Sequence, residues 1–413
     1  MKDDVMEFSD EIKNKIEEME NDLINMPLIK SNKKRCFLVS RHFLPSTASR
    51  SLTMFKLLKN SSFEYIVSSQ YVQNNKWLYG VKSNMTSRNI HQIITTEENE
   101  WEELVVREFF NLDPIYKFDF IMTCIMPPYD HKIGLEIKKR RNTIPWVALW
   151  SDPVAFSPYA NKAGDFENVA EIKKKEYEKE IFRKADLLVF TNYHQMIYML
   201  GDDFKKYREK SVIVHHGFDP DYYPKENYPS EEDRIVLAYI GHMDEYRNLY
   251  ELANGLKLSK YGSMFKVILI GHVPEEQLDY VKKLGLEDIF EYLGEKSWEE
   301  CLIEMKKCDI LVSMDPNYVN MDYSQQMSSK IADYLGAKKP ILFMSYDKGI
   351  SADIANYTNN KLIRNRGEDV AKFLDSVATL GIWMPDYEKY EIFNSRNISA
   401  YFDKQIFLKL LKI

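Results

Sequence analysis

The chain has 413 residues, 45% of them hydrophobic, and a formal net charge of −7, so we expect two domains and no nucleic-acid partner. No run approaches the ~20 apolar residues of a membrane-spanning helix, and the start, MKDDVMEFSDEIKNKIEEME, is too charged for a signal peptide. Four cysteines make no disulfide framework, so we expect a protein of the reducing cytoplasm.

Residues 1–33 are predicted to form an amphipathic helical extension. Apolar residues recur at spacings of three and four from Val5 to Met26, with acids and lysines between them, which is the pattern of a helix with one apolar face. Two interpretations stay open. The helix packs on the body of the protein, or it joins a second copy as a coiled coil, for which the stripe is short.

After Lys33, short β-rich runs alternate with helical stretches. Most runs are continuously apolar, as expected for parallel strands covered by helices on both faces. Helices are predicted at 168–184 and 298–307, among others. Such alternation is typical of doubly wound sheets. The predicted strands are 36–40, 63–69, 118–124, 145–150, 186–190, 211–216, 235–241, 266–271, 289–294, 309–314 and 340–344.

A stretch rich in proline and charge divides these strands into two sets. Residues 223–234 contain two prolines and almost no aliphatic residues, which is the composition of a linker. We therefore predict an α/β protein with two facing Rossmann-like domains of doubly wound parallel sheet. Their boundaries are 34–222 and 235–385, and residues 386–413 are predicted to form C-terminal helices.

The ligand site is expected in the cleft between the domains, because doubly wound sheets bind ligands beyond the carboxyl ends of their strands. The sequence has no Gly-x-Gly-x-x-Gly and no Walker loop, which argues against dinucleotide dehydrogenases and P-loop enzymes. It also has no His-Glu-x-x-His and no Cys-x-x-Cys pair. The candidate residues therefore have to come from other motifs.

The string SQQMSSKIADYLGAKKPIL holds the densest group of such candidates. Ser328 and Ser329 are placed to cap a helix that Gly336 ends. Lys330 in the first turn opposes the helix dipole unless an anion compensates, so the pattern favours a diphosphate ligand. Asp333 lies one turn further on the same face, where its carboxylate could accept ribose hydroxyls. A capped helix with an ion pair between these two residues explains the pattern equally well.

The string SSKIADYLGAKKPIL resembles the nucleotide-sugar-binding segment of the family 4 retaining glycosyltransferases, whose GT-B architecture has two facing Rossmann-like domains. The resemblance extends over residues 34–385 through the order and spacing of several motifs. It places Asp333 at the second acid of the family's Glu-x7-Glu motif, where it would hold the donor ribose. Gln325 stands at the first position and would face the donor sugar as a catalytic candidate. Residues 386–413 would cross back to brace the first domain.

The strand at 235–241 ends in GHMDEYRN, which resembles the family's Gly-Arg-x4-Lys/Arg-Gly turn. Gly241 stands at the turn, and Arg247 matches the second of two cations that hold the donor diphosphate. His242 replaces the first cation and is charged only part of the time near neutral pH. The implied diphosphate site is completed by Ser328, Ser329 and Lys330.

The first domain supplies the implied acceptor side. SRHFLPSTASR resembles the family's opening loop, with Ser46, Thr47 and Arg50 as its candidate residues. The stretch IMPPYDHKIGLEIKKRRNTIPWVALWSDP resembles a family stretch in which a His and an Asp-Pro lie near the acceptor. His131 and Asp152 are therefore the catalytic candidates of this domain.

Together the matches imply a hexosyltransferase that moves a sugar from a nucleoside diphosphate donor to the hydroxyl of a glycan or lipid-linked acceptor. The expected reaction keeps the anomeric configuration, serves glycan or polysaccharide biosynthesis, and uses no cofactor and no metal. Asp219 and Asp221 mimic a metal-binding pair, but their place in a family turn favours a structural role.

Two other classes stay open on the same residues. One is a non-catalytic sugar-nucleotide-binding subunit of a glycan assembly complex, and the other is a GT-B epimerase that acts on a nucleotide sugar. The basic run at 131–141 also indicates peripheral contact with the inner face of the membrane. A solvated helix end explains that run as well.

Overall fold

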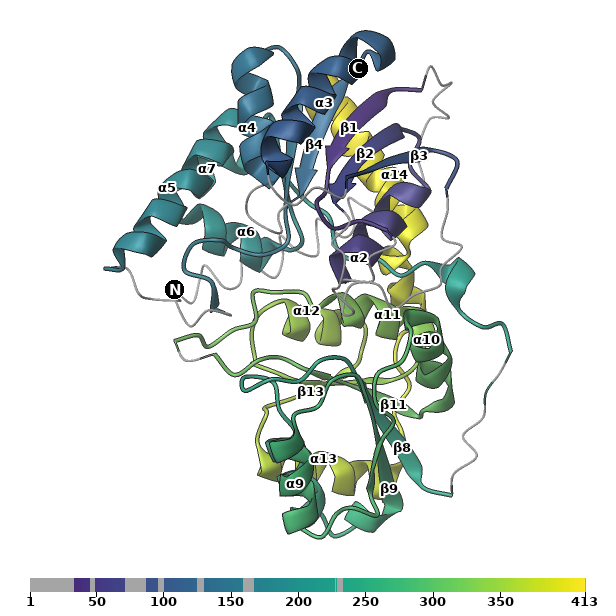
Figure 1. Ribbon diagram of the computed structural model, residues 1–413. Helices are drawn as coiled ribbons and strands as arrows, with labels where there is room; N and C mark the ends of the chain where they lie inside the picture. The colour runs from purple at the N-terminus through teal and green to yellow at the C-terminus, as the bar shows by residue number, and fades with distance from the viewer. Residues whose placement is uncertain are drawn as a thin grey trace.

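The structure, a computed structural model, has two α/β domains, each built around a fully parallel sheet (Figure 1). The predicted extension over 1–32 and the loop residues Ser46 and Thr47 lie outside the described residues. The described residues are 33–44, 49–70, 87–95, 100–124, 130–158, 167–226, 228, 233–318 and 320–412.

The N-terminal domain has a seven-stranded sheet in the order β3-β2-β1-β4-β5-β6-β7. Its central strands are buried along their whole length, because helices cover both faces. The strands are β1 Arg35–Val39, β2 Glu64–Gln70, β3 Ile90–Thr95, β4 Phe120–Cys124, β5 Trp146–Trp150, β6 Leu187–Phe190 and β7 Ser211–Ile213. The helices are α2 Ser49–Lys59, α3 Trp101–Tyr116, α4 Asp130–Arg140, α5 Val169–Lys184, α6 Tyr193–Leu200 and α7 Phe204–Tyr207.

The C-terminal domain has a six-stranded sheet in the order β10-β9-β8-β11-β12-β13. The strands are β8 Ile235–Ile240, β9 Phe265–Ile270, β10 Phe290–Tyr292, β11 Ile310–Met314, β12 Ile341–Met344 and β13 Lys361–Ile363. The helices are α8 Tyr250–Leu258, α9 Glu275–Lys283, α10 Trp298–Lys307, α11 Ser329–Ala337, α12 Ile350–Tyr357 and α13 Gly367–Leu380. A last helix, α14 Ser395–Gln405, continues as a π-helical turn over Ile406–Leu411.

The structure contains every strand that the sequence predicts and adds two edge strands, β3 and β13. The predicted helix at 298–307 is confirmed as α10, whose start is fixed by a capping box between Ser297 and Glu300. Gly336 does not end α11 as expected. The helix continues to Ala337, Lys338 ends it in the left-handed conformation, and a Cβ at Gly336 would collide with Tyr223.

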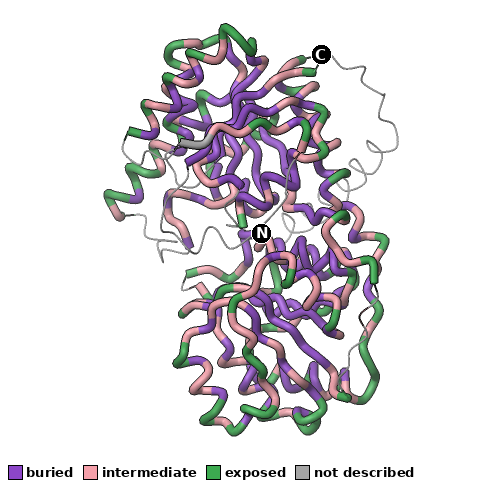
Figure 2. The backbone as a smooth tube through the Cα atoms, turned by 45° about the vertical axis from the view of Figure 1, so that its right-hand side comes forward, coloured by how far each residue is buried: buried purple, intermediate pink, exposed green. Residues whose placement is uncertain are grey.

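One apolar core crosses the boundary between the domains. It joins one face of the first sheet to α14, α11 and one face of the second sheet, and Figure 2 shows buried backbone on both sides of the boundary. Helix α14 lies against α2 of the N-terminal domain (Figure 1). There the Asp403 carboxylate accepts hydrogen bonds from the Ser61 hydroxyl and the Ser62 amide, both at 2.6 Å. Burial raises the pKa of Asp403 to about 6.

The chain crosses between the domains at two places that are bonded to each other. At the first crossing the Phe218 amide donates to the Phe393 carbonyl at 2.9 Å, and at the second the Ser395 amide donates to the Phe218 carbonyl at 2.8 Å. These bonds form a short parallel bridge between Phe218 and Asn394.

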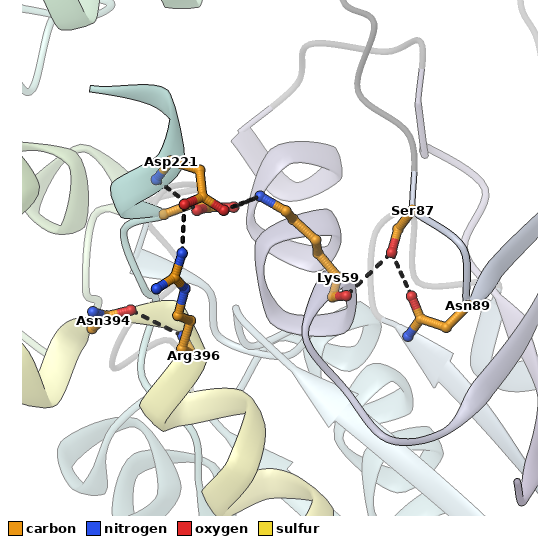
Figure 3. Close-up of polar contacts among 7 residues, drawn as sticks. Lys59, Ser87, Asn89, Asp221, Asn394 and Arg396 are labelled. Atoms are coloured by element: carbon orange, nitrogen blue, oxygen red, sulfur yellow. Dashed lines mark hydrogen bonds and ion pairs between the residues drawn. The ribbon is translucent and has the colours of Figure 1, made fainter. Parts of the chain in front are cut away.

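Side chains reinforce this bridge. Figure 3 shows Asp221 between Lys59 of α2 and Arg396 of α14. The Lys59 ammonium donates to Asp221 at 2.9 Å and to Asp219 at 2.8 Å, and the Arg396 guanidinium donates to Asp221 at 2.5 Å. The two aspartates thus bind cations of the chain itself, in keeping with the structural role expected for them.

The basic run at 131–141 lies on α4 and just beyond it. None of the described helices is long and apolar enough to cross a membrane. Each cation of the run has an acidic partner in the chain, which lowers the positive charge available to an anionic surface. The pairs are Lys132 with Glu102, Lys138 with Asp186, Lys139 and Arg140 with Glu136, and Arg141 with Asp113.

Candidate functional site

A cavity of about 780 Å³ lies between the two domains. Its walls include the ends of β5, β6 and β8, so it stands beyond the carboxyl ends of strands from both sheets. Doubly wound sheets bind ligands at this position. The cavity is therefore the candidate site, as the sequence predicts.

The lining of the cavity is cationic although the chain is acidic overall. Five cations face two carboxylates there, whereas the whole chain carries −7. A cleft with charge of one sign attracts ligands of the opposite sign. The cations are Arg50, Lys56, Arg247, Lys296 and Lys330, and the carboxylates are Asp152 and Asp333.

On the C-terminal side, Lys330 projects from the first turn of α11 toward the end of β8. Its ammonium donates to the Tyr239 hydroxyl at 2.8 Å and lies 4.4 Å from the centre of that ring. A Cβ at Gly241 would collide with this ammonium, and the positive φ of Gly241 also favours glycine. Burial lowers the pKa of Lys330 well below its ordinary value, and the nearby Arg247 adds to the shift. An anion beside Lys330 would favour its charged form.

Arg247 and His242 lie next to this lysine. Arg247 is buried, and its Nε donates to the Met314 carbonyl at 2.9 Å. His242 stacks on His272 with 4.8 Å between ring centres. Burial lowers the pKa of His242, and the second imidazole lowers it further. The resemblance predicts a cation at each of these two positions. Arg247 is a permanent cation, whereas the His242 ring is mainly neutral.

The N-terminus of α11 completes this end of the cavity. Ser328 and Ser329 line the cavity, and the Ser328 side chain makes no capping hydrogen bond. The first N–H groups of α11 therefore lack the side-chain acceptor that the sequence predicts for them. An anion in the cavity could accept from these groups instead.

Asp333 is held by side chains from both domains. Lys56 of α2 donates to its Oδ1 at 2.5 Å, and the Trp298 indole donates to its Oδ2 at 3.1 Å. Tyr223 donates to the Asp333 carbonyl at 2.9 Å and lies 3.4 Å from Oδ1. The expected partner Lys330 instead bonds Tyr239. Each carboxylate oxygen has two lone pairs, so a ribose would share Asp333 with Lys56.

On the N-terminal side, Asp152 joins the two domains. Its Oδ2 accepts from Arg50 at 2.6 Å, and its Oδ1 accepts from the Gln326 amide at 2.6 Å. The Tyr318 hydroxyl donates to the side-chain oxygen of Gln326 at 2.9 Å. Gln326, rather than the predicted Gln325, lines the cavity. The Gln325 amide is buried and has no hydrogen-bond partner among the described residues.

His131 lies in the core of the N-terminal domain, apart from the residues that line the cavity. Its Nδ1 is 2.6 Å from the Thr123 hydroxyl, and its ring lies 4.4 Å from that of Trp150. Burial lowers the pKa of His131 to about 3. A proton-transfer role for His131 therefore stays a prediction, and its contacts are those of a neutral packing residue.

The sequence predictions did not include Lys56 and Gln326. A signal for Lys56 was present, because Arg50, Thr53 and Lys56 stand three residues apart on helix α2, and all three line the cavity. Gln326 carried no such signal. Its side-chain direction depends on the backbone path before α11.

No family model and no curated protein matches this sequence. Solved structures do match the fold. Sucrose-phosphate synthase from Thermosynechococcus elongatus is 12% identical, with a TM-score of 0.66 over 90% of this chain and 98% of that chain. A glycosyltransferase from Rickettsia africae is 14% identical, with a TM-score of 0.63 over 92% of this chain and 100% of that one. The chain has the GT-B fold.

A third structure in this set contains ligands. Anabaena HepE, in complex with UDP and glucose, is 13% identical, with a TM-score of 0.55 over 90% of this chain and 95% of that chain. Each match spans both domains of the GT-B fold. The fold agreement is thus an agreement of the whole two-domain architecture.

Proposed function

We propose that the chain is a retaining hexosyltransferase of the family 4 type. It transfers a sugar from a nucleoside diphosphate donor to a hydroxyl of a glycan or lipid-linked acceptor, without a metal ion or cofactor, in the cytoplasm. The observation that carries the proposal is the buried Lys330 ammonium, which lies against Gly241 at the open N-terminus of α11. It is bonded to a tyrosine hydroxyl rather than to a carboxylate, and a diphosphate supplies the anion it lacks.

The chemical difficulty of the reaction is the departure of an anionic diphosphate as positive charge develops on the sugar. Arg247, Lys330 and the first N–H groups of α11 would stabilise the departing diphosphate in the cavity between the domains. Asp333 would hold the ribose, since its carboxylate lines the same cavity. With the nucleotide held in this way, the donor sugar would lie near the acceptor hydroxyl.

Asp152 lines the cavity from the N-terminal domain, and we assign its carboxylate to the acceptor side. Its contacts with Arg50 and Gln326 fix its orientation across the cleft. HepE, which has a similar fold, is in complex with UDP and glucose, and this supports a nucleotide sugar as the donor. The catalytic roles of Gln325 and His131 remain predictions.

A thermal-shift panel of UDP, GDP, ADP and CMP, alone and as sugar conjugates, tests the proposal first. We expect one nucleotide and its sugar conjugate to stabilise the protein, and Lys330→Ala to abolish the shift. With the matching donor, the loss of ~2–4 kcal/mol of transition-state stabilisation should lower kcat/KM about 30- to 1,000-fold.

Lys296→Gln is the matched control for that variant. Lys296 also lines the cavity, but its charge is already compensated by Glu304 at 2.7 Å, so its replacement should change neither nucleotide binding nor turnover by more than about twofold. If no nucleotide stabilises the parent at millimolar concentration, or if Lys330→Ala binds and turns over donor like the parent, the proposal is wrong.

The environment of Gln325 supports a second candidate, a non-catalytic sugar-nucleotide-binding subunit of a glycan assembly complex. An amide cannot carry the negative charge of the family's glutamate, and this one is buried beside the cavity lining. Such a subunit would bind nucleotide and leave a donor sugar unconsumed. Product from the donor alone, without acceptor, would instead identify a nucleotide-sugar epimerase.

Membrane contact through the basic run 131–141 and pairing through residues 1–33 also remain proposals. Flotation with anionic vesicles tests the first, and sedimentation of the full chain tests the second. Absence of vesicle binding would refute membrane contact, and a monomer at micromolar concentration would refute pairing.

A further inference from the structure

Arg50 lines the cavity, and two of its guanidinium nitrogens have no hydrogen-bond acceptor among the described residues. It stands in the first turn of α2, and its side chain is 13% exposed. One Nη2 hydrogen is used by Asp152 at 2.6 Å, but Nε and Nη1 are buried without a hydrogen-bond partner among the described residues. A buried guanidinium with unused donors is unfavourable, and native structures rarely keep one without a ligand or water.

Two histidines line the cavity together with Arg50. The Nδ1 of His42 is buried and likewise has no partner among the described residues, and His216 faces the same cavity. Burial lowers the pKa of both imidazoles. The charges of Arg41 and Arg50 lower that of His42 further, and the charge of Arg50 lowers that of His216. The N-terminal wall of the cavity has the charge and the free donors of an anion site.

This wall is separate from the proposed diphosphate site. Arg247 and Lys330 come from the C-terminal domain, whereas Arg50, His42 and His216 come from the N-terminal domain. The cavity of about 780 Å³ is larger than the diphosphate alone requires. A donor diphosphate on one wall leaves the opposite wall without an anion.

We propose that the acceptor of this enzyme carries a phosphate group, which binds to Arg50 and His42 on the N-terminal wall of the cavity. The inference rests on the proposed glycosyltransferase function and names the chemical class of its acceptor. Phosphate is the anion that fits, because its terminal oxygens accept from several directions. They could accept from Nε and Nη1 of Arg50, and from His42 in the tautomer that carries its proton on Nδ1. Either a soluble sugar phosphate or a lipid-linked phosphate offers this chemistry.

The test uses the full chain saturated with UDP, so that the diphosphate site is filled. Inorganic phosphate, glucose 6-phosphate and a prenyl phosphate in detergent are then titrated by calorimetry. We expect at least one phosphate probe to bind in addition to UDP, while uncharged glucose does not. The probe that binds best distinguishes the soluble from the lipid-linked source.

The informative variant is Arg50→Lys, which keeps the charge and removes the fork of donors. We expect it to weaken phosphate binding at least tenfold and to leave UDP binding within twofold of the parent. Lys296→Gln, whose charge is paired with Glu304, should leave both unchanged. Thermal unfolding of each variant confirms that it is folded.

Three results would overturn the inference: no phosphate probe binds beside UDP, Arg50→Lys binds phosphate like the parent, or Arg50→Lys weakens UDP binding by the same factor. The last would assign Arg50 to the donor instead. Failure of UDP and of every other nucleotide of the thermal-shift panel to bind the parent would refute the glycosyltransferase proposal by itself. In that case the titrations without UDP still show whether phosphate binding depends on Arg50.

Discussion

The ion pair between Lys56 and Asp333 joins the two domains inside the cavity, and its removal should be costly. The two side chains are only 4% and 12% exposed, and the ammonium and carboxylate are 2.5 Å apart. At an effective dielectric constant of ~20, their gross attraction is roughly 7 kcal/mol, which desolvation largely offsets. Lys56→Met should nevertheless lower the free energy of unfolding by about 3–5 kcal/mol, because it leaves the carboxylate buried without its cation.

The double variant Lys56→Met with Asp333→Asn should recover much of this loss. The neutral amide no longer needs a cation. Its oxygen can still accept from the Trp298 indole, and Tyr223 keeps its bond to the backbone carbonyl of residue 333. We expect the double variant to be only about 1–2 kcal/mol less stable than the parent. The coupling energy of the cycle should therefore exceed ~2 kcal/mol.

Urea unfolding followed by tryptophan fluorescence measures this cycle, with a separate fit for each domain if the transitions separate. The exposed pair of Lys282 with Asp279 is the control, and Lys282→Met should change stability by less than ~0.5 kcal/mol. A coupling energy below about 0.5 kcal/mol between Lys56 and Asp333, or a double variant no more stable than Lys56→Met, would refute the reasoning.

Two further predictions concern pH and the donor site. Burial lowers the pKa of His131 to about 3, so below pH ~6.5 only the unfolded chain takes up this proton, and stability falls toward pH 3 by up to ~1.4 kcal/mol per pH unit. His131→Asn should reduce the slope of stability against pH by this amount in urea unfolding at pH 7, 6, 5 and 4, while His216, with a similarly lowered pKa, keeps its own contribution. An unchanged slope would contradict the assignment. In Gly241→Ala the new Cβ collides with Lys330, so UDP affinity should fall at least tenfold. Gly285→Ala, at φ +68° with open space around it, isolates backbone strain, and equal UDP affinity in both variants would exclude the collision.

Much of the fold could be predicted from the sequence, because continuous apolar runs of four to six residues identify buried parallel strands wherever helices separate them. The strands missed, β3 and β13, are at the sheet edges. The run IHQIIT of β3 mixes polar residues with apolar ones, and β13 has only three residues. An edge strand is covered less completely, so its sequence carries a weaker signal.

The residues of the candidate site were predictable where a local motif marks them. Gly241 follows the end of β8 and Lys330 lies in the first turn of α11, and the structure brings these two motifs into contact. The partners of Asp333 and Asp152 could not be predicted, because Lys56 and Gln326 reach them from the opposite domain. Such contacts depend on how the domains are placed relative to each other, and no local spacing encodes that placement.

The bonded crossings at Phe218 and Asn394 also determine how the cleft can open. Lys59 and Arg396 both bind Asp221 (Figure 3), so the two crossing segments are held together and form one pivot on the side of α14. Away from α14, helices α6 and α12 face each other (Figure 1), joined by His194 and Asp353 at 2.6 Å. We expect a rotation about this pivot to part the His194–Asp353 contact and to leave both crossings intact. A ligand would then enter the cavity at the α6–α12 rim.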